Sequence, residues 1–229
     1  ILCSPDAYFV NYTDKGSLHN LKFKQLNLVE ELRSGEVQID VKASGVNFKD
    51  LAVMYDWVQD TTLGYELSGI VRKSNSSKFK AGDEVIAMGQ NCFANTTVCH
   101  ERFVWQKPAE LSFDAAAGVT LSYGTAFLTL IHFAKIRSTD TVLIHSATGA
   151  LGLAAIEICK HIGCRIIASA GSLEKRDYLK TQGINLVTDS RDYKTYIQDV
   201  TQFTDGQGVD VVLASTIGKQ MEANLALLK

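Results

Sequence analysis

The second half of the sequence alternates between short apolar runs and longer amphipathic stretches, and this alternation constrains the fold most strongly. The runs are rich in β-branched residues and apolar on both faces, as is typical of strands buried in a parallel sheet. Helices must then cover both faces, and right-handed crossovers make the sheet doubly wound, as in nucleotide-binding domains. The predicted strands are 141–146, 165–169, 184–188 and 209–214, and the predicted helices are 112–115, 119–134, 149–162, 173–182, 193–203 and a last helix ending at 229.

The chain before residue 110 has a different pattern, in which short alternating runs are broken by Gly, Asn, Ser and Asp. Alternation of apolar and polar residues predicts half-buried strands, and frequent turn residues predict antiparallel connections. The predicted strands are Val37–Ala43, Glu66–Val71 and Glu84–Met88. We therefore expect an α/β protein with an antiparallel β domain at residues 1–110 and a nucleotide-binding domain at residues 111–229.

The charge balance argues against several classes of partner. With 23 basic and 25 acidic residues the net charge is -2, so the chain lacks the basic excess that neutralises nucleic acid or an anionic membrane. Its apolar runs are of strand length, well below the roughly 20 residues that span a bilayer. The five cysteines include no C-x-x-C pair, which argues against a disulfide framework or a zinc site and favours a reducing cytoplasm.

A loop of small residues follows the first strand of the second half. It contains Thr148, Gly149, Ala150, Leu151 and Gly152 and leads directly into a predicted helix. The pyrophosphate of a dinucleotide binds at a helix N-terminus, where backbone N–H groups point at it and small residues let the backbone come close. Glycine at a strand-to-helix corner also serves for its backbone freedom alone. Within a β-α-β unit we interpret these residues as cofactor-binding.

The end of the second strand indicates which dinucleotide binds. NAD sites carry an acidic residue there, about 20 residues beyond the loop, which accepts a hydrogen bond from the ribose 2′-hydroxyl. Here the strand is followed by Gly171 and Ser172, and Lys175 and Arg176 lie close to the start of the next helix. Hydroxyls and cations suit a 2′-phosphate, so the sequence favours NADPH. The alternative is that Ser172 only caps the helix and that the two cations are solvated.

Several segments match, in order, the signature of a known family. Residues 45–50 read Gly-Val-Asn-Phe-Lys-Asp, and residues 63–69 read Leu-Gly-Tyr-Glu-Leu-Ser-Gly. Thr125-Ala126-Phe127 precedes the loop of small residues, and Ser190-Arg191-Asp192 and residues 206–213 follow it. This series resembles the enoyl reductase domains of polyketide synthases and animal fatty acid synthase, which are zinc-free members of the medium-chain dehydrogenase/reductase superfamily. The resemblance covers most of the chain.

The resemblance implies a GroES-like antiparallel β domain followed by a Rossmann domain, here incomplete at its C-terminal end. It implies an NADPH-dependent enoyl reductase module of a multidomain polyketide or fatty acid synthase, which reduces an α,β-unsaturated acyl thioester carried by an acyl carrier protein. The implied partners are that carrier-bound substrate and the neighbouring synthase domains, and a homodimer of the parent synthase is left open. Neither nucleic acid nor a membrane is expected.

The resemblance also implies roles for individual residues. Asn47 and Thr125 would lie near the nicotinamide and its ribose, and Ser172 and Lys175 would bind the 2′-phosphate. Arg191, in a further matching segment, is also assigned to the cofactor. Zinc-bearing relatives carry a Cys where Asn47 stands, so no metal is expected.

Some positions depart from the family pattern. The usual Pro, Gly and Asn are replaced by Thr120, Ala150 and Ala214. A tyrosine that many relatives carry as proton donor aligns with Val58, so the catalytic acid is unknown, and Tyr55 is the nearest candidate. Relatives continue beyond Lys229, so this chain alone is expected to be poorly active or inactive. Two alternatives remain: a non-catalytic remnant with a structural role in the synthase, and a stand-alone quinone or enone reductase.

Overall fold

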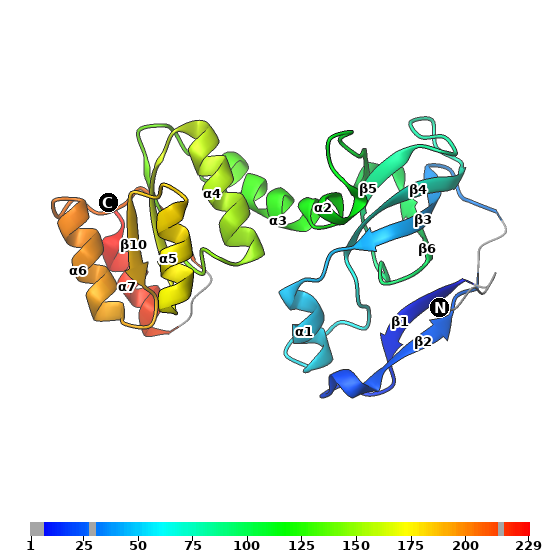
Figure 1. Cartoon of the computed structure of the whole chain (residues 1–229), viewed down its shortest axis with the longest axis horizontal. Helices are drawn as coiled ribbons and strands as arrows, with labels where there is room; N and C mark the ends of the chain where they lie inside the picture. Colours follow the sequence, from blue (N-terminus) through cyan, green and yellow to red (C-terminus); the bar gives the residue numbers. More distant parts are fainter. Residues whose placement is uncertain (1–6, 28–30, 215–217) are drawn as a thin grey trace. The chain divides into compact units, whose positions relative to one another are not determined.

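The computed structural model describes residues 7–27, 31–214 and 218–229. The chain divides into two compact units, Ile1–Leu121 and Ser122–Lys229 (Figure 1). This division falls within helix α3 (Val119–Ala126). The boundary at residue 110 was predicted from a change in sequence pattern. That change follows the last strand of unit 1, β7 (Val104–Gln106).

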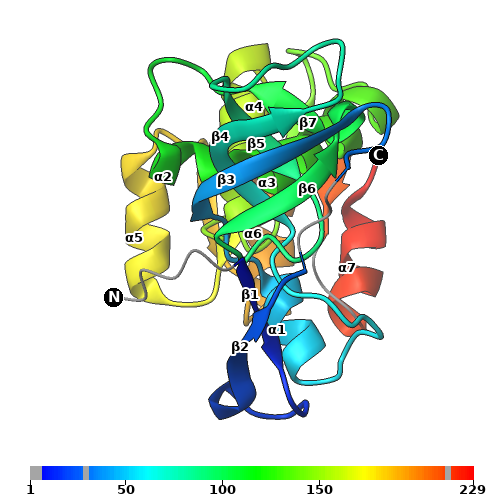
Figure 2. The same ribbon diagram turned by 90° about the vertical axis from the view of Figure 1, so that its right-hand side faces the viewer.

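Unit 1 contains an antiparallel sheet with the strand order β6-β3-β4-β5-β7 (Figure 2). Its other strands are β3 (Glu36–Ser44), β4 (Glu66–Ser74), β5 (Glu84–Met88) and β6 (Thr96–His100). Val37, Ile39, Leu67 and Val85 point to one side and form its buried core. The predicted strands correspond to β3, β4 and β5, whereas β6 and β7 were not predicted.

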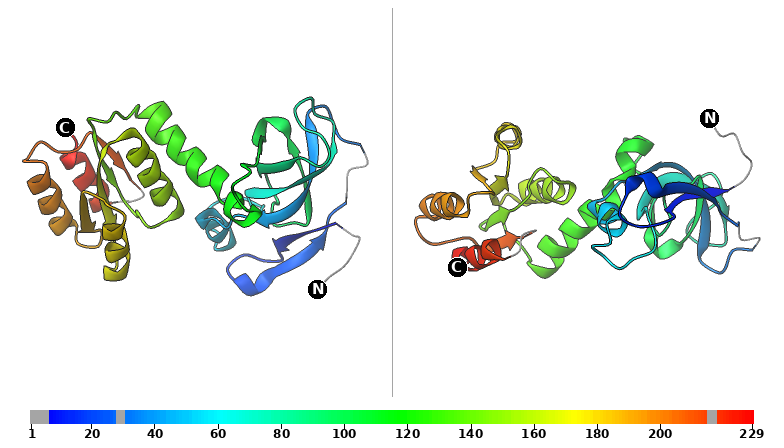
Figure 3. Two further views of the ribbon diagram at one scale, coloured as in Figure 1. Left: turned by 45° about the horizontal axis from the view of Figure 1, so that its top comes forward. Right: turned by 90° about the horizontal axis from the view of Figure 1, so that it is seen from below.

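A hairpin of β1 (Tyr8–Tyr12) and β2 (Leu21–Gln25) lies beside helix α1 (Phe48–Met54) in unit 1 (Figure 3). Val53 and Met54 of the helix form a small buried cluster with Leu63, against which Tyr12 and Leu21 of the hairpin pack. This hairpin and α1 were not predicted. The shorter helices of the unit are η1 (Leu18–Asn20), η2 (Glu101–Phe103) and α2 (Phe113–Ala117).

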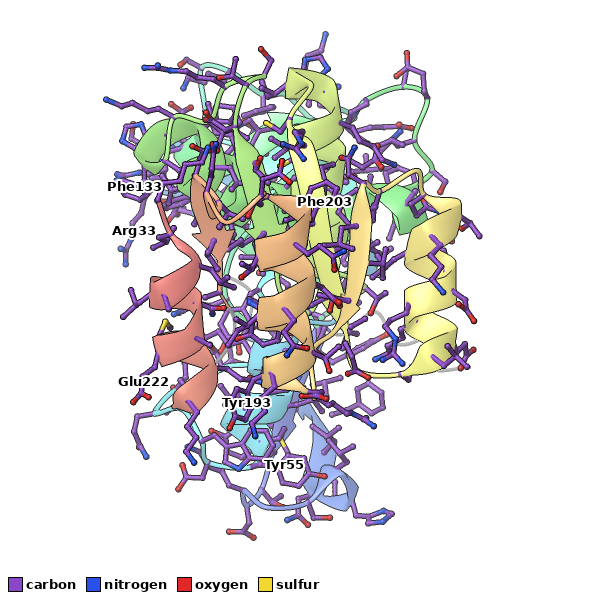
Figure 4. The ribbon with its side chains drawn as sticks, turned by 90° about the vertical axis from the view of Figure 1, so that its left-hand side faces the viewer. Arg33, Tyr55, Phe133, Tyr193, Phe203 and Glu222 are labelled. Carbon is purple, nitrogen blue, oxygen red and sulfur yellow. The ribbon has the colours of Figure 1, made fainter. Side chains whose placement is uncertain are left out.

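Unit 2 is built around a parallel sheet with the strand order β10-β9-β8-β11 (Figure 4). Its strands are β8 (Thr141–Ile144), β9 (Arg165–Ala170), β10 (Leu186–Asp189) and β11 (Val211–Leu213). Its helices are α4 (Ala150–Ile162), α5 (Leu173–Thr181), α6 (Tyr193–Phe203) and α7 (Lys219–Leu227). The order of strands and helices follows the prediction, and α6 begins and ends at the predicted residues.

Both faces of the parallel sheet are buried, as the apolar runs predicted. Val142 and Ile144 of β8 pack on one face, in a cluster that includes Leu179 of α5. Leu143 points to the other face and packs in a cluster with Tyr196 of α6. Helices α4 and α5 thus cover one face, and α6 and α7 cover the other (Figure 1).

The predicted helix 119–134 is not α-helical throughout, because α3 continues into a π-helix, η3 (Phe127–Phe133). The backbone N–H of Ala134 donates to the carbonyl of Thr129, five residues earlier. The Thr129 hydroxyl donates to the carbonyl of Thr125 at 2.8 Å. A threonine hydroxyl that takes a carbonyl one turn back competes with the helical ladder, and local widening of this kind is typical of short π segments.

Among the residues described, no helix is both long enough and apolar enough to cross a membrane.

Candidate functional site

The loop after β8 lies where the strand order of the parallel sheet reverses. β8 has β9 on one side and β11 on the other. The backbone N–H of His145 donates to Leu213 of β11 at 3.1 Å, and that of Ala147 donates to Ser169 of β9 at 3.1 Å. A loop held between the ends of two diverging strands is where doubly wound sheets bind their ligands. The loop of small residues therefore lies at the switch point of the parallel sheet.

The backbone of this loop is shaped for close approach. Gly149 is the residue before helix α4, and its N–H donates to the carbonyl of Ser146 at 2.8 Å. A Cβ added to Gly152 would lie 2.6 Å from the Cα of Ala147, so only glycine lets the helix pack on the loop. Ala150 opens α4 with a helical backbone, so its extra methyl group is accommodated. The first N–H groups of α4 have no helical acceptor and can bind an anion.

The loop also contains Thr148 and Leu151. Both are half-buried, on either side of the helix start.

A buried hydrogen-bonded network lies under the loop. His145 is 3 % exposed, with its Nδ1 2.7 Å from the Ser169 hydroxyl and its Nε2 2.7 Å from Oδ1 of Asn224 on α7. The Tyr196 hydroxyl also reaches Asn224 Oδ1 at 3.4 Å. Burial lowers the pKa of His145, and the hydrogen bond to Asn224 partly opposes this shift. Sequence reasoning missed the network, although a histidine at the end of an apolar strand was a visible signal.

The end of β9 carries cations instead of an acid. Arg191 lies across Gly171, because a Cβ built on that glycine would be 2.9 Å from its Nε. Ser172 is the N-cap residue directly before helix α5, and its hydroxyl accepts from the backbone N–H of Lys175 at 3.3 Å. The Ser172 hydroxyl thus caps the helix, as the alternative interpretation expected, and it keeps its own proton to donate. The side chains of Lys175 and Arg191 are exposed.

Arg176 has a different position from these two cations. It forms an ion pair with Asp189, with 2.7 Å between its Nη1 and Oδ2, and donates to the carbonyl of Ala170 at 3.2 Å. The other carboxylate oxygen of Asp189 accepts from the backbone N–H of Arg191 at 2.8 Å. Arg176 therefore joins the ends of β9 and β10. The carboxylate of Asp189 is bound by Arg176 and by the backbone of Arg191.

In unit 1 the predicted site residue Asn47 precedes helix α1 and contacts a buried carboxylate. Its side-chain Nδ2 donates to Oε1 of Glu66 at 2.9 Å. Oε2 of Glu66 accepts from the hydroxyl of Thr120 and from the backbone N–H of Leu121, both at 2.9 Å. Glu66 is only 1 % exposed. Sequence reasoning placed it within a family motif without a role.

The lysine of the 45–50 segment is held by another polar cluster. Lys49 lies 3.0 Å from Oδ2 of Asp60 and over the ring of Tyr65, 3.9 Å from its centroid. The hydrogen bond from Lys49 holds the pKa of Asp60 well below its usual range. Burial, the largest influence on Lys49, lowers its pKa, but hydrogen bonds and charges of Asp60 and Tyr65 raise it overall. Lys49 thus ties α1 to the segment before β4.

The proton-donor candidate Tyr55 directly follows helix α1 as its C-cap residue. Its side chain is 40 % exposed and stacks on Trp57, with 5.5 Å between ring centroids. Trp57 in turn lies 6.0 Å from the ring of Phe48. Val58, at the position of the family tyrosine, is also exposed. The hydroxyl of Tyr55 belongs to an exposed aromatic surface of unit 1.

The last predicted contact, Thr125, lies on the exposed side of α3 in unit 2, and its carbonyl accepts from Thr129. The structure brings the loop residues together, and separately Ser172, Lys175 and Arg191. It places Asn47 in unit 1. In the parts of the chain that the structure describes, no three His, Cys, Asp or Glu side chains are grouped as a metal ion would require.

Comparisons with known proteins match segments of both units. The family model of the alcohol dehydrogenase GroES-like domain matches residues 33–127, and that of the zinc-binding dehydrogenase matches residues 150–229. A highly reducing polyketide synthase of Didymella fabae is 35% identical over 95% of this chain. A mycocerosic acid synthase-like polyketide synthase of Mycobacterium tuberculosis is 37% identical over 93% of it. The chain spans only 12% and 10% of the lengths of these two proteins.

Solved structures give the same relationship over a larger share of the compared chain. The CurK enoyl reductase has a TM-score of 0.90 and 31% identity, over 98% of this chain and 71% of that one. The CurF enoyl reductase-type cyclopropanase of curacin A biosynthesis has a TM-score of 0.91 and 30% identity, over 98% and 72%. These similarities confirm the GroES-like and Rossmann folds and the family that the sequence segments indicated. The chain belongs to the enoyl reductase domains of polyketide synthases, in the medium-chain dehydrogenase/reductase superfamily.

Proposed function

We propose that this chain binds NADPH and serves a synthase as its enoyl reductase, reducing an α,β-unsaturated acyl thioester on an acyl carrier protein. The arrangement at the end of β9 carries the cofactor assignment, because Arg191 lies across Gly171 beside the hydroxyl of Ser172, with Lys175 in the first turn of α5. A guanidinium, an ammonium and a hydroxyl complement the charge and acceptor oxygens of a 2′-phosphate. A side chain at position 171 would displace Arg191.

The nearby acid supports NADPH over NADH. A carboxylate that recognises a ribose 2′-hydroxyl stands near the end of the second strand and accepts a hydrogen bond from it. Both oxygens of Asp189 already have partners, one in Arg176 and the other in the backbone N–H of Arg191. No carboxylate stands at the end of β9 itself, where Ala170 is followed by Gly171.

The remaining predicted residues have roles in holding the cofactor. The start of α4, with Thr148, Gly149 and Leu151, binds the pyrophosphate through backbone N–H groups, and Gly152 lets the helix approach. Asn47 and Thr125 bind the nicotinamide ribose. When bound, NADPH supplies a hydride to the β-carbon of the substrate, whose α-carbon then takes a proton.

The proton donor is proposed to be Tyr55. Its hydroxyl belongs to an exposed side chain that stacks on Trp57. A general acid must come within hydrogen-bond reach of the atom that it protonates. Fixed stacking of the ring reduces the number of orientations that this hydroxyl explores.

The polyketide synthases similar to this chain are much longer than it is, which supports neighbouring synthase domains as its partners. We place the chain in the cytoplasm of its cell, with a carrier-bound acyl group as substrate and with a homodimer of the parent synthase as its assembly.

A non-catalytic remnant is the second candidate, and particular positions favour it. Val58 stands where many relatives carry a tyrosine, and Ala214 stands where they carry an amide. Both side chains are apolar, so neither position supplies a polar group to a ligand.

Titration with NADPH and NADH separates the candidates. The reductase is expected to bind NADPH more tightly than NADH, whereas a remnant binds neither. Oxidation of NADPH is then followed with a crotonyl group on an acyl carrier protein, with the same group on pantetheine, and with a free quinone. Preference for the carrier-bound substrate supports the synthase role, and preference for the quinone contradicts it. Mass spectrometry of the acyl product distinguishes reduction from the cyclopropane formation named for CurF.

A further inference from the structure

Glu66 is a buried carboxylate that is satisfied by neutral donors. It accepts three hydrogen bonds, from the side chains of Asn47 and Thr120 and from the backbone of Leu121. None of the ion pairs in the described residues includes it. Burying a carboxylate without a cation is costly unless each oxygen is hydrogen-bonded. A buried carboxylate that lowers the stability of the fold in this way is a candidate for a functional role.

The space for this carboxylate is provided by a glycine. A Cβ added to Gly45 would lie 2.6 Å from Cγ of Glu66 and closer still to its Oε1. Gly45 and Asn47 belong to the same short segment between β3 and α1. The segment therefore makes room for Glu66 and donates a hydrogen bond to it.

The contact determines which way the Asn47 amide points. A carboxylate can only accept hydrogen bonds, so the NH₂ group of Asn47 must face Glu66 and its carbonyl oxygen must face away. Asn47 is half-exposed at the start of α1, where it forms a capping box with Asp50: its side chain faces the backbone N–H of Asp50, and Oδ2 of Asp50 accepts from the Asn47 backbone N–H at 2.8 Å. A carbonyl oxygen has two lone pairs, so Oδ1 can accept from a ligand as well as face the helix N-terminus.

We propose that Glu66 is a positioning residue, which fixes the Asn47 amide so that its carbonyl oxygen accepts a hydrogen bond from a hydroxyl group of the ligand. The identity of that hydroxyl rests on the proposed function, in which it belongs to the nicotinamide ribose. Glu66 is itself anchored to the first turn of α3 through Thr120 and Leu121. The same carboxylate therefore sets the donor and acceptor pattern at Asn47 and caps the start of a helix.

The substitution Glu66→Gln tests this role with almost no change in size. The carbonyl oxygen of the new glutamine is needed by the donors of Thr120 and Leu121, so its NH₂ group faces Asn47. Two NH₂ groups cannot pair, and the Asn47 amide turns over to present its own NH₂ to the ligand. NADPH should bind about tenfold to a hundredfold more weakly, as expected when a hydroxyl donor meets another donor.

A second substitution provides the rescue. With Glu66→Gln and Asn47→Asp together, the new glutamine donates to one oxygen of the new aspartate, and the other oxygen accepts from the ligand. The double variant should recover most of the NADPH affinity. Asn47→Asp alone places two carboxylates in contact and should bind NADPH at least as weakly as Glu66→Gln. A merely structural role for Glu66 predicts no rescue.

Adenosine 2′,5′-bisphosphate is the matched probe, because it carries the 2′-phosphate but lacks the nicotinamide ribose. Its affinity should be the same for the unsubstituted chain and for Glu66→Gln. A readout without cofactor is the ¹⁵N–¹H resonance of the Asn47 side-chain amide, identified by its loss in Asn47→Asp. This resonance should show slow exchange in the unsubstituted chain and faster exchange in Glu66→Gln.

The outcomes are distinguishable. Equal NADPH affinity and an unchanged Asn47 resonance in Glu66→Gln would overturn the positioning role. Equal weakening of NADPH and the bisphosphate, without rescue in the double variant, would also overturn it and indicate a loss of folding. If the unsubstituted chain binds neither probe, the proposed function fails. The Asn47 resonance then decides the orientation of the amide by itself.

Discussion

Removing the ammonium group near the start of α5 should reduce the preference for NADPH over NADH. Lys175 lies in the first turn of the helix with its side chain exposed, and its backbone N–H reaches the Ser172 hydroxyl at 3.3 Å. Lys175→Ala keeps that backbone contact and removes the ammonium group together with its aliphatic stem. A hydrogen bond to a charged group contributes about 1.5 to 3 kcal/mol. The NADPH to NADH affinity ratio should therefore fall by about tenfold to a hundredfold.

The assay is a fluorescence titration of both cofactors at two salt concentrations. NADH lacks the 2′-phosphate, so its affinity should not change. Because the contact is exposed, added salt should reduce the preference of the unsubstituted chain more than that of the variant. Lys180→Ala is the matched control, since Lys180 lies near the other end of α5 and pairs with Asp177 at 2.8 Å. Equal loss of NADH and NADPH affinity in Lys175→Ala, or a similar change in the control, would refute the assignment of this pocket.

Three further predictions concern the glycines of the loop after β8, the buried His145 and the expected absence of zinc. Gly152→Ala should lower the free energy of unfolding by about 1 to 3 kcal/mol, as overpacking does, because its Cβ would lie 2.6 Å from the Cα of Ala147. Gly149→Ala should lower it less, because its Cβ would meet only the Ser146 carbonyl, at 3.2 Å. Chemical denaturation measures both free energies. The pKa of His145 is lowered by burial, so below about pH 6.5 the unfolded chain binds a proton that the folded chain does not. Stability that is present above that pH should fall as the pH drops, by up to about 1.4 kcal/mol per pH unit, and the fall should be smaller in His145→Gln. Elemental analysis of chelator-free protein should find no stoichiometric zinc, and one zinc per chain would contradict this.

The parallel sheet could be predicted because each of its signals is local. A strand buried on both faces reads as a continuous apolar run, and Val142, Leu143 and Ile144 have core partners on opposite faces of the sheet. The π-helix could not be predicted in the same way. Its apolar residues have helical spacing, and the deviation depends on where the Thr129 hydroxyl forms its hydrogen bond.

The hairpin of unit 1 escaped prediction for a different reason. Residues of β1 are half-buried and most of β2 is exposed, so neither strand has a clear alternation of buried and exposed positions. The hairpin is positioned by contacts with distant residues, such as the hydrogen bond from Gly16 to the carbonyl of Met54 at 2.6 Å. A contact between two segments so far apart leaves no periodic signal in either of them.

The proposed 2′-phosphate site at the end of β9 was partly predictable and partly not. Ser172 and Lys175 follow the strand directly, so their neighbourhood could be read from the order of residues. The engagement of Arg176 by Asp189 could not, because it depends on β10 lying beside β9. The same pairing of strands brings Arg191 over Gly171.

The departures from the family pattern acquire a physical meaning around Glu66. Thr120 stands where relatives carry a proline, which has no hydroxyl, and here that hydroxyl donates to Oε2 of Glu66 at 2.9 Å. Asn47 stands where zinc-bearing relatives carry a cysteine, and its amide donates to Oε1. A thiol is a weaker donor than an amide NH₂, so both positions have the side chains that a buried carboxylate without a cation requires. The threonine at position 120 therefore adds a hydrogen-bond donor to the group that orients Asn47.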